Sequence, residues 1–177
     1  VEIKEIQDVN LSNPIIIEGF PGVGMIGTIS SAYLAEKLVM TLIGYFTSSH
    51  FPPVAAIHNF KPMTPMRIYA SEKYNLIILF SELVIPADAV YSLANAVIDF
   101  SKKHNAKMIY SLAGIASQTP DEKTYGIPSD DAVAQQLRDK NVELIKEGAT
   151  QGVSGVLIAE FAVQKIPAAN LIVQTAA

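Results

Sequence analysis

The sequence contains no cysteine and no tryptophan, and Arg67 and Arg138 are its only arginines. The absence of cysteine excludes zinc fingers, iron–sulfur clusters, thiol catalysis and a disulfide scaffold. Its three histidines, His50, His58 and His104, do not form H-E-x-x-H or H-x-H patterns. We therefore expect no metal site.

Positive charge is also scarce. Lys and Arg number 13 against 17 for Asp and Glu, which gives a net charge of −4. Nucleic-acid binding requires clustered cations that neutralise phosphates, so we expect no nucleic-acid partner. No apolar run reaches the roughly 20 residues of a membrane helix, and no signal peptide opens the sequence. We therefore expect a cytoplasmic protein with no membrane partner.

The surface should be short of charge as well. Charged residues make up 17% of the 177 residues and hydrophobic residues 50%, whereas soluble domains have about 25% charged residues. We expect one domain over residues 1–177 whose exposed apolar area is covered in a homo-oligomer. The candidate contacts are Phe20 with Pro21, Phe51 with Pro53, and Tyr91; burial of the Phe20 and Phe51 loops in the core of the domain is the alternative.

Strand-like and helix-like segments alternate along the chain. This alternation predicts an α/β fold, a three-layer α/β/α arrangement with a mixed, mostly parallel sheet. Strands are expected at 15–17, 39–46, 54–58, 66–70, 76–80 and 108–112, near 143 and at 171. Helices are expected at 28–38, after an Asp88 N-cap, at 130–140 and at 154–165. The first of these has apolar residues at helical spacing: Ile29, Tyr33, Leu34 and Leu38. Residues 118–131 are predicted to form a long polar loop, a candidate lid.

Gly22, Gly24 and Gly27 form a G-x-G-x-x-G pattern between the first strong strand and the first helix. A dinucleotide site also needs an acidic residue at the end of the next strand, but no Asp or Glu occurs between Glu36 and Glu72. We therefore expect no cofactor and a structural turn that a side chain at Gly22 or Gly24 would crowd. Binding of a simple anion by exposed amides of this loop remains an alternative.

Candidate catalytic side chains are few. Ser154 lacks a G-x-S-x-G elbow and is expected to be a helix N-cap. Acidic residues in the polar 118–131 region offer a pair for acid–base chemistry as an alternative, although such residues usually contact solvent or cap a helix: Asp121, Glu122, Asp130 and Asp131. We expect no catalytic residue.

Four short motifs occur in a fixed order: residues 18–24 with Gly27 (EGFPGVG…G), 51–55 (FPPVA), 67–69 (RIY) and 113–115 (AGI). Over residues 13–174 this series resembles archaeal members of the proteasome assembly chaperone family. The resemblance implies a phosphorylase/hydrolase-like α/β/α domain that forms a homotrimer or homotetramer. It also implies binding to proteasome α subunits without established catalysis.

The first interpretation is therefore a non-enzymatic chaperone or scaffold in proteasome assembly. The alternative is an enzyme or binding protein for a nucleotide, nucleoside or phosphate ester that uses the Gly22–Gly27 loop. The expected partner- or ligand-binding residues are Gly19, Phe20, Pro21, Gly22, Val23, Gly24, Gly27, Phe51, Pro52, Pro53 and Tyr125. The family resemblance also implies C-terminal helices and a terminal hydrophobic-Tyr-any tripeptide. Because the sequence ends Thr175-Ala176-Ala177, we expect it to be C-terminally incomplete.

Overall fold

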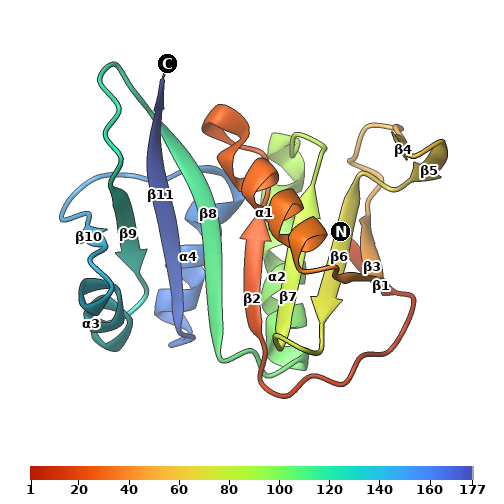
Figure 1. Cartoon of the computed structure of the whole chain (residues 1–177), viewed down its shortest axis with the longest axis horizontal. Helices are drawn as coiled ribbons and strands as arrows, with labels where there is room; N and C mark the ends of the chain where they lie inside the picture. Colours follow the sequence, from red (N-terminus) through yellow and green to blue (C-terminus); the bar gives the residue numbers. More distant parts are fainter. Residues whose placement is uncertain (177) are drawn as a thin grey trace.

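The computed structural model describes residues 1–176, in which nine strands form one mixed sheet of order β1-β3-β6-β7-β2-β8-β11-β9-β10 (Figure 1). The strands are β1 (Glu2–Glu5), β2 (Ile15–Gly19), β3 (Thr41–Thr47), β6 (Met66–Ser71), β7 (Leu76–Ser81), β8 (Met108–Ser117), β9 (Thr124–Pro128), β10 (Glu143–Leu144) and β11 (Ala168–Ala176). The central strands β7, β2, β8 and β11 run parallel to one another. Antiparallel pairs flank them. The α/β class is confirmed.

Helices cover both faces of this sheet. The helices are α1 (Ile26–Lys37), α2 (Val90–Lys103), α3 (Asp131–Asp139) and α4 (Gly152–Val163), and the short 3₁₀ turns η1 (Val23–Met25) and η2 (Ala87–Ala89) precede α1 and α2. Figure 1 shows α1 in front of β2 and β7 and α2 and α4 behind the sheet, giving the expected three layers. Within residues 1–176, none of these helices is long and apolar enough to span a membrane.

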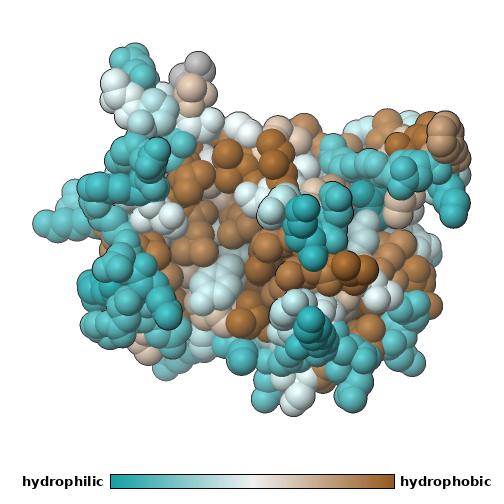
Figure 2. Space-filling model, in the orientation of Figure 1, coloured by the Kyte–Doolittle hydropathy of each residue, from teal (hydrophilic) through white to brown (hydrophobic). Residues whose placement is uncertain are grey.

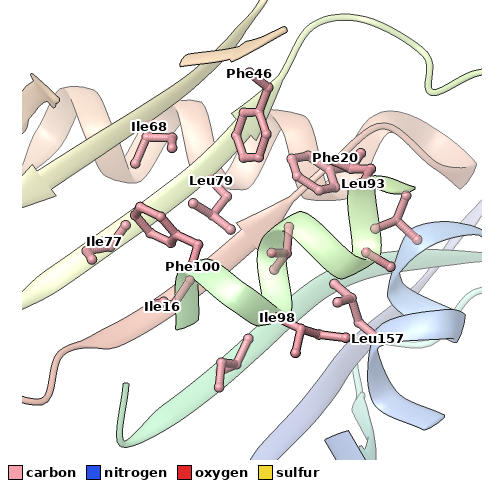
Figure 3. Close-up of a cluster of buried hydrophobic side chains, with 14 of the residues drawn as sticks. Ile16, Phe20, Phe46, Ile68, Ile77, Leu79, Leu93, Ile98, Phe100 and Leu157 are labelled. Carbon is pink, nitrogen blue, oxygen red and sulfur yellow. The ribbon is translucent and has the colours of Figure 1, made fainter. Parts of the chain in front are cut away.

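The main core lies between the sheet and the α2–α4 layer. Figure 3 shows Ile16, Ile77 and Leu79 of the strands facing the helices that carry Leu93, Phe100 and Leu157. Each of these six side chains is at most 4% exposed. Burial of one such side chain contributes roughly 1.5–3 kcal/mol relative to exposure. The apolar β-branched runs of β2 and β7 are therefore explained by burial on both faces.

Helix α1 agrees with only part of the expected apolar face, because Leu34 and Leu38 are half-buried against a core cluster but the other two residues are exposed. Ile29 and Tyr33 are 61% and 59% exposed, and the buried positions are small: Gly27, Thr28, Ser31 and Ala35. A Cβ on Gly27 would lie 2.5 Å from the carbonyl oxygen of Leu112, so the helix backbone comes too close to the sheet for larger side chains. Close approach, rather than hydrophobic spacing, decides which face of α1 is buried.

Three other local predictions are wrong. Part of the expected 118–131 loop is strand β9, which pairs antiparallel with β11, because its Thr, Tyr and Ile residues favour an extended chain. Asp88 lies inside η2 and bonds His50 instead of capping α2. Ser154 lies inside α4, whose N-cap is Gln151. By contrast, Asp130 caps α3 by accepting a hydrogen bond from the amide of Val133, in agreement with the expected start of that helix.

A small two-stranded hairpin stands apart from the main sheet. Its strands, β4 (Ala56–His58) and β5 (Lys61–Met63), pair only with each other among the strands of residues 1–176. Figure 1 shows the hairpin projecting beyond the β3–β6 side of the sheet. Strand β4 lies within the strand expected at 54–58, whereas β5 was not expected.

Candidate functional site

Two of the predicted binding segments meet at one edge of the sheet. The glycine loop, residues 19–27, follows the carboxyl end of β2, and the Phe51–Pro53 step follows the end of β3, which runs in the same direction as β7. Ligands of open α/β sheets usually bind at this carboxyl edge. Both segments reach the main core: the ring of Phe20 lies 5.9 Å from that of Phe46 on β3 in an edge-to-face arrangement, and Phe51 packs against the same core.

The glycine loop packs closely on its neighbours. Gly24 has φ +66°, and a Cβ there would lie 2.8 Å from Cγ2 of Thr175 on β11. A Cβ on Gly114 of β8 would lie 2.3 Å from the carbonyl oxygen of Val23. The loop therefore needs glycine for backbone packing onto β8 and β11, as a structural turn would.

Gly22 does not share this role. Its φ is −155°, which is extended, and no atom lies within 4 Å of a Cβ built on it. The expectation that a side chain at Gly22 would crowd the turn is therefore wrong. Only Gly24 of this pair combines a positive φ with a close neighbour.

The exposed part of this edge is smaller than the sequence suggests. Phe20 is only 5% exposed and belongs to the main core, so the expectation that its ring forms an intermolecular contact is wrong. Phe51 is half-buried and packs against the same core. Accessible surface comes instead from Val23, which is 41% exposed, and from the exposed Pro52 and Pro53.

The strand that follows the glycine loop has an unsuitable position for dinucleotide binding. Helix α1 leads into β3, and the strands β6 and β7 separate β3 from β2 in the sheet. In a dinucleotide-binding unit the next strand lies beside the first and supplies the ribose-binding acid. The topology therefore agrees with the reading of this loop as a structural turn.

Glu18 is a buried carboxyl that the sequence reading missed. It is 0% exposed at the end of β2 and accepts hydrogen bonds from the Phe20 amide at 2.8 Å and the Ser154 hydroxyl at 3.0 Å. Burial raises the pKa of Glu18, and the hydrogen bonds from Ser111, Phe20 and Ser154 only partly oppose this. Its position directly after an isoleucine run and before a glycine was the available signal.

Asn170 of β11 extends this buried cluster. Its side-chain nitrogen donates to the carbonyl oxygen of Ser154 at 3.2 Å. Buried carboxyls with raised pKa values occur at catalytic sites, but they also occur in structural networks. Glu18 bonds its own loop and α4, so its evident effect is to hold the start of the glycine loop against the helix layer.

Tyr125 does not join the glycine loop. It lies on β9, and β8 and β11 separate that strand from β2. Its hydroxyl donates to Asp121 at 2.7 Å and accepts from Gln174 at 3.3 Å, and the bond to Asp121 raises the pKa of Tyr125. Across residues 1–176, no three His, Asp or Glu side chains gather as a metal-binding group.

Arg67 and Glu82 connect the hairpin to the sheet. Arg67 is 4% exposed, and its guanidinium donates to Glu82 at 3.0 Å and to the carbonyl oxygen of Thr64 at 2.8 Å. His58 of the hairpin contacts the other oxygen of Glu82 at 2.7 Å. Arg67, the first residue of the Arg-Ile-Tyr motif, therefore helps to anchor residues 54–65 through Glu82 and Thr64.

The chain belongs to the PAC2 family, whose model matches residues 16–177. Protein MJ0106 of Methanocaldococcus jannaschii is 30% identical over 167 residues, which cover 94% of this chain and 68% of that protein.

Solved structures give the same result. PbaA of Pyrococcus furiosus, described as an archaeal homolog of proteasome-assembly chaperone, is 31% identical, with a TM-score of 0.88 over 98% of this chain and 76% of PbaA. PbaB of the same organism, described as an archaeal proteasome activator, is 20% identical with a TM-score of 0.83, over 98% of this chain and 79% of PbaB, and supports the fold alone. The resemblance to archaeal proteasome assembly chaperones is confirmed.

Proposed function

We propose that this chain is a non-enzymatic, chaperone-like scaffold in proteasome assembly that acts as a homo-oligomer and binds proteasome α subunits. The observation that carries the proposal is the similarity to PbaA, at 31% identity and a TM-score of 0.88 over nearly the whole chain. The low content of charged residues and the exposed apolar side chains support association with other protein surfaces.

The carboxyl edge of the sheet supports a binding role over a catalytic one. Its glycines pack against β8 and β11, and its buried carboxyl, Glu18, is bonded within the chain. What this edge offers to solvent is Val23 together with Pro52 and Pro53. Rigid apolar residues lose little conformational entropy on binding, which suits them to a protein contact.

Light scattering and a pull-down test the two parts of this proposal separately. At micromolar concentration the full-length protein should have the mass of a trimer or tetramer, and immobilised protein should retain purified proteasome α subunits but not β subunits. A monomeric mass would contradict the oligomer. Failure to retain α subunits would contradict the partner. Saturable thermal stabilisation by a nucleotide or nucleoside would instead favour a small-molecule site.

A further inference from the structure

The β4–β5 hairpin carries large apolar side chains into solvent. Residues 54–63, here called the arm, include Val54, Ile57 and Phe60, which are 55%, 73% and 103% exposed. Figure 2 shows the hydrophobic surface of this projection at its upper right. An exposed apolar group of this size on a projecting element marks an interaction surface.

The backbone of the arm's turn is strained at the residue with the most exposed side chain, Phe60. Asn59 and Phe60 link the paired residues His58 and Lys61, and both have positive φ, 50° and 65°. Hairpin turns of this kind favour Asn followed by Gly, because a bulky side chain is unfavourable at positive φ. Phe60 therefore carries both backbone strain and a solvent-exposed ring. Such locally unfavourable choices concentrate at functional sites.

Two contacts hold the arm against the end of the sheet, one next to its turn and one at its base. His58 contacts Glu82 at 2.7 Å, and the Glu82 amide donates to the carbonyl oxygen of Pro65 at 2.9 Å. Prolines stiffen the backbone on both sides of the turn. A rigid arm presents Phe60 with little entropy left to lose on binding.

A second apolar surface lies on the other half of the sheet. It is formed by Tyr110 and Leu112 of β8 with Leu171 and Val173 of β11, here called the open face, and all four are half-buried. Alternate residues of a strand share a face, so Ala169, Leu171, Val173 and Thr175 of β11 lie on the same face of the sheet. At the two ends of this series, Thr175 lies against the glycine loop and Ala169 packs with α3. Leu171 and Val173 lie between those two covered positions.

The open face has no covering helix. Figure 1 shows α1 on one side of it and α3 on the other, and no helix of residues 1–176 crosses β8 and β11 on this face. Figure 2 shows hydrophobic surface between these two elements. Gly27 of α1 borders this face at the Leu112 carbonyl, and Tyr110 and Leu171 pack against the cluster that includes Val133 and Leu137 of α3, so the uncovered part lies around Leu112 and Val173. Parallel strands are normally covered on both faces, so this part of β8 and β11 lacks a partner.

We propose that the arm of one copy binds the open face of a second copy, with Phe60 seated against Leu112 and Val173. This inference rests on the proposed homo-oligomer and specifies its contact. The charges are complementary. Lys61 is the only full charge in residues 51–66, whereas residues 118–147, beside the open face, hold seven acidic and four basic side chains. Because the two surfaces lie on different parts of the chain, repeated contacts of this kind run head-to-tail and form a ring when the rotation between copies closes.

Cross-linking tests the contact directly, because residues 1–177 contain no cysteine. Full-length Phe60→Cys and Val173→Cys proteins are mixed in equal amounts and oxidised with copper phenanthroline. The account predicts a disulfide-linked dimer in this mixture and none from either variant alone. Phe60→Cys mixed with Val163→Cys, an exposed site on α4, is the matched control and should give no link. Self-linking of Phe60→Cys, or no link in the first mixture, would overturn the proposal.

The Phe60→Gly variant gives a second test that does not depend on disulfide cross-linking. Glycine suits the positive φ of this turn, so the fold should be kept, as circular dichroism checks, while the mass falls toward that of a monomer. An unchanged oligomeric mass would overturn the arm contact. Retention of α subunits by wild-type protein in that case would leave the proposed function standing, whereas a failure of wild-type protein to retain them would contradict the function itself.

Discussion

The hydroxyl of Ser154, in the first turn of α4, donates a hydrogen bond of 3.0 Å to Oε2 of Glu18 at the end of β2. This bond joins residues 136 positions apart and ties the strand that leads into the glycine loop to the helix layer behind the sheet. Because Glu18 is fully buried, its pKa is raised above the ordinary value of a glutamate.

Glu18→Gln should therefore stabilise the protein increasingly as pH rises. The folded-state pKa of Glu18 is raised above its ordinary value of 4.5, so its favourable contribution is complete below about pH 4.5 and is lost as pH rises through the folded-state pKa. Glutamine has no charge to bury and keeps polar atoms facing Phe20 and Ser154. Melting temperatures from pH 4 to 8 should show a growing gap between variant and wild type. Glu122→Gln, at an exposed carboxyl, is the control, and a gap that shrinks with pH would contradict the assignment.

Gly24→Val should destabilise the fold and Gly22→Val should not. The first substitution places a branched residue at φ +66° against Thr175, for an expected loss of about 1–3 kcal/mol of unfolding free energy. The second adds a side chain at an extended, open position, with an expected change within about 0.5 kcal/mol. Urea unfolding of both variants makes the comparison. Equal stabilities would show that Gly24 is not required by the backbone.

Glu82→Ala should loosen the arm from the sheet. The substitution leaves the buried Arg67 guanidinium without its carboxylate and removes the contact of His58, for an expected loss of about 1–3 kcal/mol. Limited proteolysis should then cleave within residues 54–65 faster than in wild type. Lys123→Ala removes an exposed ion pair with Glu143 and serves as the control, with little effect expected. An unchanged rate of cleavage in Glu82→Ala would show that the contacts of Glu82 do not hold the arm.

Val23→Asp should weaken binding to proteasome α subunits without unfolding the chain. Val23 is exposed within the glycine loop, so the charge reaches solvent in the free protein but is buried in the proposed complex. Surface plasmon resonance should show at least a tenfold weaker affinity. Val39→Asp, at an 86% exposed position following the far end of α1, is the control. Equal affinities of the wild type, Val23→Asp and Val39→Asp would show that the partner does not bind at the glycine loop.

The strands were predictable because burial on both faces leaves long apolar runs, as in β2 and β7. The buried face of α1 was not, because its packing depends on small residues such as Gly27 and Ser31 rather than on apolar spacing. Strand β1 was missed since its sequence, Glu2-Ile3-Lys4-Glu5, carries charges that an edge strand tolerates.

The site was predictable only as a set of segments. The glycine pattern located the loop, but the exposure of Val23 and the burial of Phe20 follow from how the loop folds onto β8 and β11. The network of Glu18 joins strands and a helix that lie far apart in the sequence, so no local spacing revealed it.

Native mass spectrometry of α-ring assembly tests the central claim most directly. Purified proteasome α subunits are mixed with the full-length protein, and the species present are followed over time against α subunits alone. The account predicts complexes that contain both proteins and a faster appearance of complete α rings. Ring assembly at an unchanged rate, with no complex of the two proteins at any time, would contradict it.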